Sequence, residues 1–184
     1  MARTLQAASA LSIEPACTHG AELSIRVWQP AAILHLEGSR AGDGVADATL
    51  PATGRCISDE AGSLLSIGPD VYLRVGAVDD TAALTSRFEV VVDVSSAWVC
   101  LALEGSKAVA LLRKGCAVDL HPRMFPAGSC CATGMARIRV VLWRPGIESR
   151  YEMLVGRSYA LSLWSWLIDA AAEYGPQRTK EGIL

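Results

Sequence analysis

Three aspartates, two tryptophans and a run of arginines are the side chains whose type and spacing offer chemistry in this sequence. The aspartates are Asp70, Asp93 and Asp119, and each falls where a strand or turn is predicted to end. At such positions an aspartate usually accepts hydrogen bonds from backbone N–H groups. An acid–base role stays open for them, but their positions favour a structural role.

The sequence lacks the usual signatures of a metal site, a nucleophile or a dinucleotide site. His19, His35 and His121 are solitary, since none has another histidine or cysteine three or four residues away. The cysteines show no Cys-x-x-Cys spacing and are predicted to be free thiols packed as small apolar residues. They are Cys17, Cys56, Cys100, Cys116, Cys130 and Cys131. Without a Gly-x-Ser-x-Gly, a Gly-x-Gly-x-x-Gly or a Walker loop, no cofactor is expected in this chain.

Arginines form the densest run of one charge sign, at Arg137, Arg139, Arg144, Arg150 and Arg157. Arg144 and Arg150 border a predicted loop and are expected to be solvated. Arg137 and Arg139 have the same parity on a predicted strand, so they share a face and could meet acidic groups of a larger partner. Arg157 immediately precedes the predicted N-cap of the last helix. It is interpreted as a subunit contact, although an internal clamp would explain it equally well.

Two tryptophans lie two residues apart on that last helix, at Trp164 and Trp166. Side chains at this spacing cannot face the same surface of a helix. We assign Trp164 to the core and Trp166 to an interface, where tryptophan is favoured.

Composition limits the class of protein and the kinds of partner. The chain has 184 residues, 51% hydrophobic and 20% charged, which is enough to bury the core of a single domain over 1–184. Its net charge of -2 gives no electrostatic reason to expect nucleic acid or anionic lipid. No apolar run approaches the ~20 residues of a membrane span. A mean hydropathy of +0.29 is high and favours an apolar surface covered by a partner.

The two ends of the chain, 1–20 and 176–184, are expected to be flexible. The first ten residues lack the continuous apolar core of a signal peptide, so a cytoplasmic protein is expected.

Alternation and turn signals predict strands that must position these side chains. They cover 23–28, 31–36, 64–67, 71–75, 88–93, 99–103, 130–135, 138–143 and 151–155. Helices are predicted over 79–86, 107–114 and 158–174, the second with Ser106 as its N-cap and Gly115 beyond its end. Any helix over 45–50 is weak. The order of these elements indicates an α+β fold with antiparallel or mixed sheets and packed helices.

The joints between these elements carry a series of short motifs in one order. They read Ile67-Gly68-Pro69-Asp70, Asp93-Val94-Ser95-Ser96, Lys114-Gly115-Cys116-Ala117-Val118-Asp119-Leu120, Phe125-Pro126-Ala127-Gly128-Ser129-Cys130, Gly156-Arg157-Ser158-Tyr159-Ala160 and Leu163-Trp164-Ser165-Trp166-Leu167. Over residues 50–175 this series resembles the gamma subunit of bacterial heterotetrameric sarcosine oxidase. That family is in turn similar to the folate-binding aminomethyltransferases, which implies a small folate-binding-domain-like fold.

The resemblance implies a non-catalytic accessory subunit of a flavin-dependent complex. That complex oxidises sarcosine to glycine, formaldehyde or methylene-tetrahydrofolate, and hydrogen peroxide. It implies alpha, beta and delta subunits as partners, chiefly the large alpha subunit. FAD, FMN, NAD, tetrahydrofolate and zinc are then expected on the other subunits.

One departure from the folate-binding enzymes bears on activity. Those enzymes place a carboxylate near the folate nitrogens on the hairpin after the Gly128 turn, and here residues 132–143 contain no acidic residue. Loss of such a group should cost several kcal/mol of catalysis. This chain is therefore not expected to act on folate. Two alternatives stay open: the small subunit of a related enzyme such as N-methylglutamate dehydrogenase, and a free-standing folate-dependent aminomethyltransferase-like enzyme.

Overall fold

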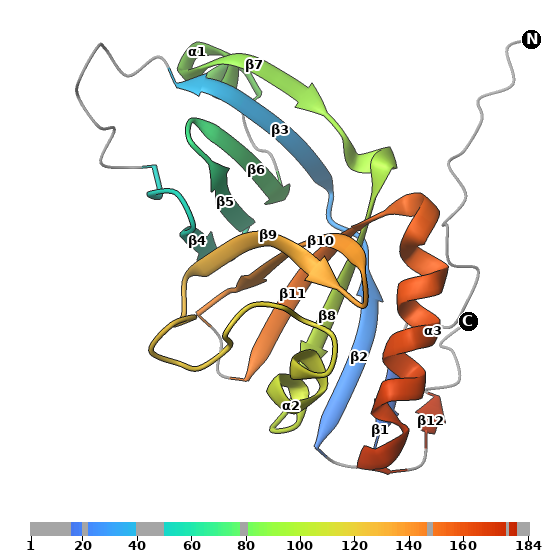
Figure 1. The fold of residues 1–184 in the computed structure, drawn as a ribbon. Helices are drawn as coiled ribbons and strands as arrows, with labels where there is room; N and C mark the ends of the chain where they lie inside the picture. Colours follow the sequence, from blue (N-terminus) through green and yellow to red (C-terminus); the bar gives the residue numbers. More distant parts are fainter. Residues whose placement is uncertain are drawn as a thin grey trace, which may run out of the picture.

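The computed structural model describes residues 16–19, 22–39, 50–77, 81–146, 149–175 and 177–179. Twelve strands form two antiparallel sheets in this part of the chain, with helices on the outside (Figure 1). The expected α+β class is confirmed. Of the two sheet types that were expected, only the antiparallel one occurs among the described strands, because every pairing there is antiparallel.

The larger sheet has seven strands in the order β12-β1-β2-β8-β11-β10-β9. Their bounds are β12 Gln177–Thr179, β1 Ala16–His19, β2 Leu23–Trp28, β8 Trp98–Glu104, β11 Arg150–Gly156, β10 Ile138–Arg144 and β9 Ser129–Met135. Strands β9 and β10 form the predicted hairpin, and β11 returns beside β10 as expected. Strands β1 and β12 were not predicted. They pair with each other within the two end segments 1–20 and 176–184, whose flexibility stays a prediction.

The smaller sheet has five strands in the order β4-β5-β6-β3-β7. Their bounds are β4 Cys56–Asp59, β5 Gly62–Gly68, β6 Val71–Gly76, β3 Ala32–Ser39 and β7 Phe88–Asp93. The turn between β5 and β6 is the predicted Gly68-Pro69-Asp70 turn, and Asp70 adopts a positive φ of 53° there. Strand β4 was not predicted.

Three helices accompany the sheets: α1 Thr81–Arg87, α2 Ala108–Arg113 and α3 Ala160–Ala171. Short 3-10 turns flank α3 at Arg157–Tyr159 and Ala172–Tyr174. The predicted N-cap of α2 is wrong, because Lys107 occupies that position and no side chain caps the helix. The Ser106 hydroxyl instead donates to Glu22 at 3.0 Å. The weak helix considered over 45–50 lies outside the described residues, except for Leu50.

The larger sheet is buried on both faces. Its outer face packs under α2 and α3 in a cluster that includes Leu101, Leu103, Leu163 and Leu167. Its inner face packs against the smaller sheet, with Trp143 and Leu154 meeting Ile33, Leu65 and others. Strands that are covered twice must be apolar at nearly every position, which explains the continuous apolar runs of β8, β10 and β11.

A third, smaller cluster lies on the far face of the smaller sheet and contains Leu34, Leu36, Tyr72 and Phe88. The Tyr72 and Phe88 rings have their centroids 5.5 Å apart in a tilted arrangement. Within the described residues, no helix is long and apolar enough to cross a membrane.

Candidate functional site

The two arginines expected to share one strand face lie instead at the tip of the β9–β10 hairpin. Arg137 belongs to the two-residue turn, where it and Ala136 adopt positive φ values of 67° and 48°. Only Arg139 is on β10, opposite Gly134 of β9. Both arginine side chains are exposed, and neither forms an ion pair with any residue that the structure describes. The same-face prediction is therefore wrong for Arg137, while a partner contact stays a prediction.

Arg157 begins the 3-10 turn that leads into α3, whereas the sequence predicted that it would directly precede the N-cap of the helix; that N-cap is Tyr159. Its Nη1 donates to the Ser96 carbonyl at 3.3 Å, which links the start of α3 to the start of β8. The residue as a whole is half-buried. Exposed Tyr159 and Leu161 lie close by in sequence, with 58% and 51% of their surfaces accessible.

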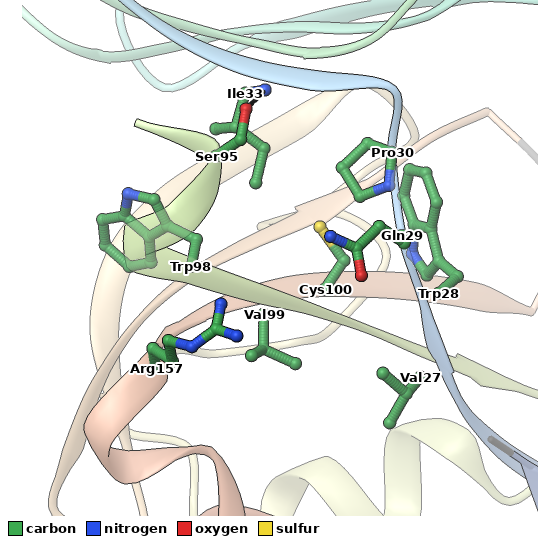
Figure 2. Close-up of a pocket in the computed structure, with 10 residues that line it drawn as sticks. All are labelled: Val27, Trp28, Gln29, Pro30, Ile33, Ser95, Trp98, Val99, Cys100 and Arg157. Atoms are coloured by element: carbon green, nitrogen blue, oxygen red, sulfur yellow. Dashed lines mark hydrogen bonds between the residues drawn. The ribbon is translucent and has the colours of Figure 1, made fainter. Parts of the chain in front are cut away.

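A small cavity of about 20 Å³ lies beside Arg157, between β2, β8 and the Ser95 turn (Figure 2). Its lining includes Trp28, Gln29, Ser95 and Cys100. The Trp28 indole N–H is buried without a hydrogen-bond partner among the described residues. A volume of this size holds about one water molecule. This cavity is too small for a substrate.

The two tryptophans of α3 differ in burial, but both contact the cluster between α3 and the larger sheet. Trp164 is 6% exposed and belongs to the cluster between α3 and the larger sheet. Trp166 is half-buried, and its ring lies against Gly115, where an added Cβ would come within 2.5 Å of the ring. Gly115 also accepts a hydrogen bond from the Ala136 N–H at 3.0 Å, which brings the Trp166 ring and the hairpin tip to the same end of the molecule. A role for Trp166 in an interface stays a prediction.

The motif aspartates accept backbone hydrogen bonds, as expected. Asp70 accepts from the Ser39 N–H at 2.9 Å and Asp119 from the His121 N–H at 2.9 Å. Asp93 accepts from both the backbone and the hydroxyl of Ser95, and these bonds lower the pKa of Asp93. The carboxylates of Asp93 and Asp119 shape local turns, and that of Asp70 links the β5–β6 turn to the end of β3.

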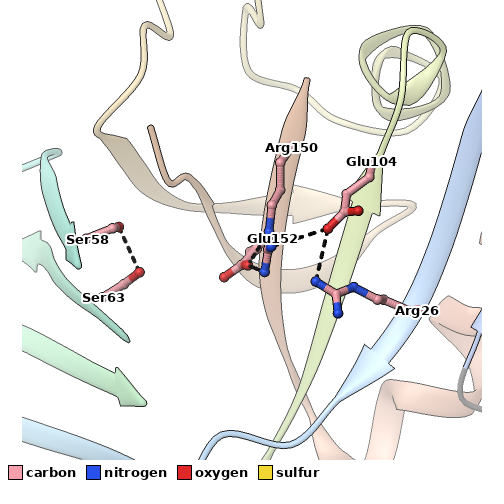
Figure 3. Close-up of polar contacts among 6 residues, drawn as sticks. All are labelled: Arg26, Ser58, Ser63, Glu104, Arg150 and Glu152. Atoms are coloured by element: carbon pink, nitrogen blue, oxygen red, sulfur yellow. Dashed lines mark hydrogen bonds and ion pairs between the residues drawn. The ribbon is translucent and has the colours of Figure 1, made fainter. Parts of the chain in front are cut away.

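A cluster of charged side chains that the sequence analysis missed lies on the inner face of the larger sheet (Figure 3). Glu152 of β11 has only 5% of its side chain exposed, and its Oε1 accepts bonds from Nε and Nη2 of Arg150. Glu104 of β8 binds Arg150 at 3.3 Å and Arg26 of β2 at 3.0 Å. Burial raises the pKa of Glu152, while Arg150 and Arg26 act in the opposite direction.

A signal for Glu152 was present in the sequence. It is the one charged residue inside the apolar run Tyr-Glu-Met-Leu-Val, in a strand that is buried on both faces. Arg150, expected in a solvated loop, is the first residue of that strand and is half-buried. In the register of the sheet, Glu152 lies directly opposite Trp143 of the hairpin. A carboxylate therefore lies beside the acid-free hairpin, on the neighbouring strand.

The cluster borders a cleft of about 620 Å³ between the two sheets. On the larger sheet the cleft is lined by Trp28, Arg150 and Glu152. Across the gap, the β4–β5 turn contributes side chains that include Ser58 and Ser63, whose hydroxyls are 2.8 Å apart (Figure 3). The cleft combines an aromatic ring with convergent polar groups, as ligand sites commonly do.

The thiols carry no sign of reactivity. Burial raises the pKa of Cys130 to about 12 and that of Cys131 to about 11, so both are protonated at neutral pH. Every cysteine whose side chain the structure describes is free. No group of three or more His, Cys, Asp and Glu side chains in the described residues could hold a metal ion.

Comparison with known proteins identifies relatives of one kind. Residues 50–173 match the model of the sarcosine oxidase, gamma subunit family. The sarcosine oxidase subunit gamma of Corynebacterium sp. (strain U-96) is 38% identical over 130 residues, which cover 67% of this chain and 63% of that protein. The subunit gamma of Corynebacterium sp. (strain P-1) is 36% identical over 126 residues, covering 65% of this chain and 62% of that one. The chain thus aligns with somewhat less than two-thirds of the length of these curated relatives.

A solved structure is similar over more of the fold. It is a chain of the heterotetrameric sarcosine oxidase from Corynebacterium sp. U-96 in complex with pyrrole 2-carboxylate. The two chains superpose with a TM-score of 0.70 and 30% sequence identity, over 84% of this chain and 86% of the other.

Proposed function

Because this chain belongs to the sarcosine oxidase gamma subunit family, we propose that it is an accessory, non-catalytic subunit of a flavin-dependent heterotetrameric sarcosine oxidase. The complex would oxidise the N-methyl group of sarcosine, giving glycine, formaldehyde or methylene-tetrahydrofolate, and hydrogen peroxide. The observation that carries the proposal is the likeness to a chain of a heterotetrameric sarcosine oxidase over 84% of this chain.

The chemistry of the chain agrees with an accessory role. The thiols whose pKa values are raised are protonated, and the motif aspartates are engaged in turns. FAD, FMN, NAD, tetrahydrofolate and zinc would then be held by the other three subunits. We also propose that the fold is a reduced form of the folate-binding domain of the aminomethyltransferases, and that the complex works in the cytoplasm.

The alpha subunit is the proposed chief partner, and the start of α3 is the surface that we assign to it. Half-buried Arg157 lies there, and the exposed side chains of Tyr159 and Leu161 follow it two and four residues further along the chain. Aromatic residues and arginine are enriched at protein interfaces, and apolar residues of this size are seldom grouped on a free surface. The proposed interface continues to the hairpin tip, where Arg137 and Arg139 offer charge to acidic groups of the partner.

The edge of β9 near that tip supports the same assignment. Ala132 and Gly134 of β9 are exposed. One edge of β9 pairs with β10. At the other edge only the two terminal residues are bridged among the described residues, Ser129 to Arg55 and Met135 to Cys116. Small side chains at an open sheet edge leave room for another chain to approach.

The proposal is tested by affinity purification of the tagged chain from its source organism. We expect larger flavin-containing subunits in stoichiometric amounts, identified by mass spectrometry, and a purified assembly that forms hydrogen peroxide with sarcosine. Turnover with N-methylglutamate and none with sarcosine would assign the chain to the related dehydrogenase instead. Recovery of the chain alone would contradict the accessory role.

A further inference from the structure

The cleft between the two sheets has no task in an accessory role, yet it has the features of a small-molecule site. Its volume of about 620 Å³ lies within the usual range for ligand pockets, roughly 300–1,000 Å³. It is lined by one large aromatic side chain, Trp28, together with a few polar groups from both sheets.

Glu152 is a buried residue with one carboxylate oxygen that accepts no hydrogen bond from a described residue. Its Oε1 accepts both bonds from Arg150, whereas its Oε2 has no hydrogen bond to any other residue that the structure describes. Figure 3 shows the second oxygen turned away from Arg150, toward the side of the cleft where Ser58 and Ser63 lie. A carboxylate oxygen that has no partner and lies at a cleft can accept a hydrogen bond from a charged donor.

The charge around the cleft favours a cation. Four carboxylates border it or contact its lining residues: Glu152, Asp59, Glu60 and Glu104. Three arginines oppose them, and each is already engaged: Arg150 by Glu152 and Glu104, Arg26 by Glu104, and Arg74 by Asp59 at 3.7 Å. The Trp28 ring adds an aromatic surface of the kind that attracts organic cations.

We propose that this cleft binds a small organic ammonium ion, with Glu152 Oε2 accepting its N–H and Trp28 contacting its apolar part. The Ser58 and Ser63 hydroxyls supply further polar contacts from the opposite sheet. The proposal does not depend on the partner subunits.

Nuclear magnetic resonance of the full chain, labelled with ¹⁵N, tests the proposal with benzylammonium as the probe. The Trp28 indole N–H signal, identified by its loss in Trp28→Phe, is expected to shift in a saturable manner. Benzyl alcohol, which has the same ring and no charge, is expected to leave the signal in place.

Two substitutions make the test specific. Glu152→Gln keeps the shape of the side chain and removes its charge, and should weaken benzylammonium binding by roughly tenfold or more. Asp169→Asn removes an exposed carboxylate on α3 and should leave the affinity unchanged. No saturable shift, an equal response to benzyl alcohol, or equal affinity in folded Glu152→Gln would each overturn the proposal. A loss of binding in Asp169→Asn would overturn it as well, because the effect would then be one of overall charge.

Discussion

At the scale of single residues, Glu152 is the most deeply buried charged side chain in the described part of the chain. It lies on a strand covered on both faces, where an isolated ionised carboxylate would be strongly destabilising. Arg150 compensates through two hydrogen bonds to one oxygen, and Glu104 ties Arg150 to Arg26. The cluster neutralises itself along three adjacent strands and leaves one acceptor directed at the cleft.

The raised pKa of Glu152 predicts a particular pH dependence of stability. A carboxyl whose pKa is higher in the folded state contributes stability below its ordinary value of 4.5, and that contribution is lost as the pH rises through the folded pKa. The unfolding free energy of the wild type, relative to Glu152→Gln, should therefore fall as the pH increases above about 4.5. Urea unfolding of both proteins across this range measures the difference. A difference that grows with pH would show that the attraction of Arg150 lowers the pKa of Glu152 by more than burial raises it.

Substitutions at Trp164 and Arg157 distinguish a residue that packs in the core from a residue proposed to contact the partner. Trp164→Ala should lower the unfolding free energy by roughly 3–5 kcal/mol, because the ring fills the space between α3 and the larger sheet. Arg157→Ala should cost less, roughly 1–2 kcal/mol, because the half-buried side chain contributes polar contacts such as the bond to the Ser96 carbonyl and no core packing, and it should weaken assembly with the alpha subunit.

Thermal unfolding and a pull-down of the alpha subunit are the measurements for that pair. If Arg157→Ala unfolds the chain as readily as Trp164→Ala, the arginine is an internal clamp onto Ser96, and the interface assigned to it is wrong.

At the scale of elements, the contact between α3 and the segment after α2 is tight. Gly115 accepts the Ala136 N–H and lies under the Trp166 ring, so the end of α2, the hairpin tip and α3 meet at one backbone position. A side chain here has no space, because its Cβ would lie 2.5 Å from the ring and 3.1 Å from the Ala136 nitrogen.

Gly115→Ala should therefore destabilise the chain by about 1–3 kcal/mol through overpacking. Gly134→Ala is the matched control, since nothing lies within 4 Å of the added carbon on the exposed edge of β9. The control should be neutral or slightly stabilising. Chemical denaturation of the two variants measures both effects, and equal losses would mean that the contact with Trp166 is not the cause.

The central strands could be predicted because each is long enough for its own residues to show an alternating or apolar pattern. Alternation and apolar runs predict β7 and β8 to within about two residues, and the same holds for the β9–β10 hairpin and β11. The short strands β1, β4 and β12 were missed, because three or four residues are too few to show an alternating pattern. For β12 the partner, β1, is also far away in sequence. Ser106 was mistaken for a helix cap since its competitor, Glu22, is also distant.

The cleft could not be predicted for the same reason. Its two walls come from the β4–β5 turn and from β11, about ninety residues apart in the chain. Only the unusual Glu152 in an apolar strand pointed toward it. Trp164, whose place in the core depends on the spacing within one helix, was located correctly.

At the scale of the whole molecule, the exposed apolar side chains are consistent with a chain that works in an assembly. Val92 and Ile57 have nearly half of their surfaces accessible, and Met124 has 69%. Single exposed apolar side chains of this kind are ordinary on protein surfaces, but Tyr159 and Leu161 at the start of α3 follow Arg157 closely in sequence.

The isolated chain is expected to be colourless and inactive. Its sequence offers no dinucleotide-binding loop, and a bound flavin would absorb visible light. A visible spectrum and a peroxide assay with sarcosine on the purified chain are the measurements. Flavin absorbance or turnover in this sample would contradict the non-catalytic role.

Native mass spectrometry of the assembly purified through this chain tests the central claim most directly. We predict one dominant species in which this chain is bound to three other subunits, and from which a 19.5 kDa component can be released. The Arg157→Ala assembly should release that component more readily than the wild type. A wild-type sample containing only the 19.5 kDa chain, or only copies of it, would contradict the account.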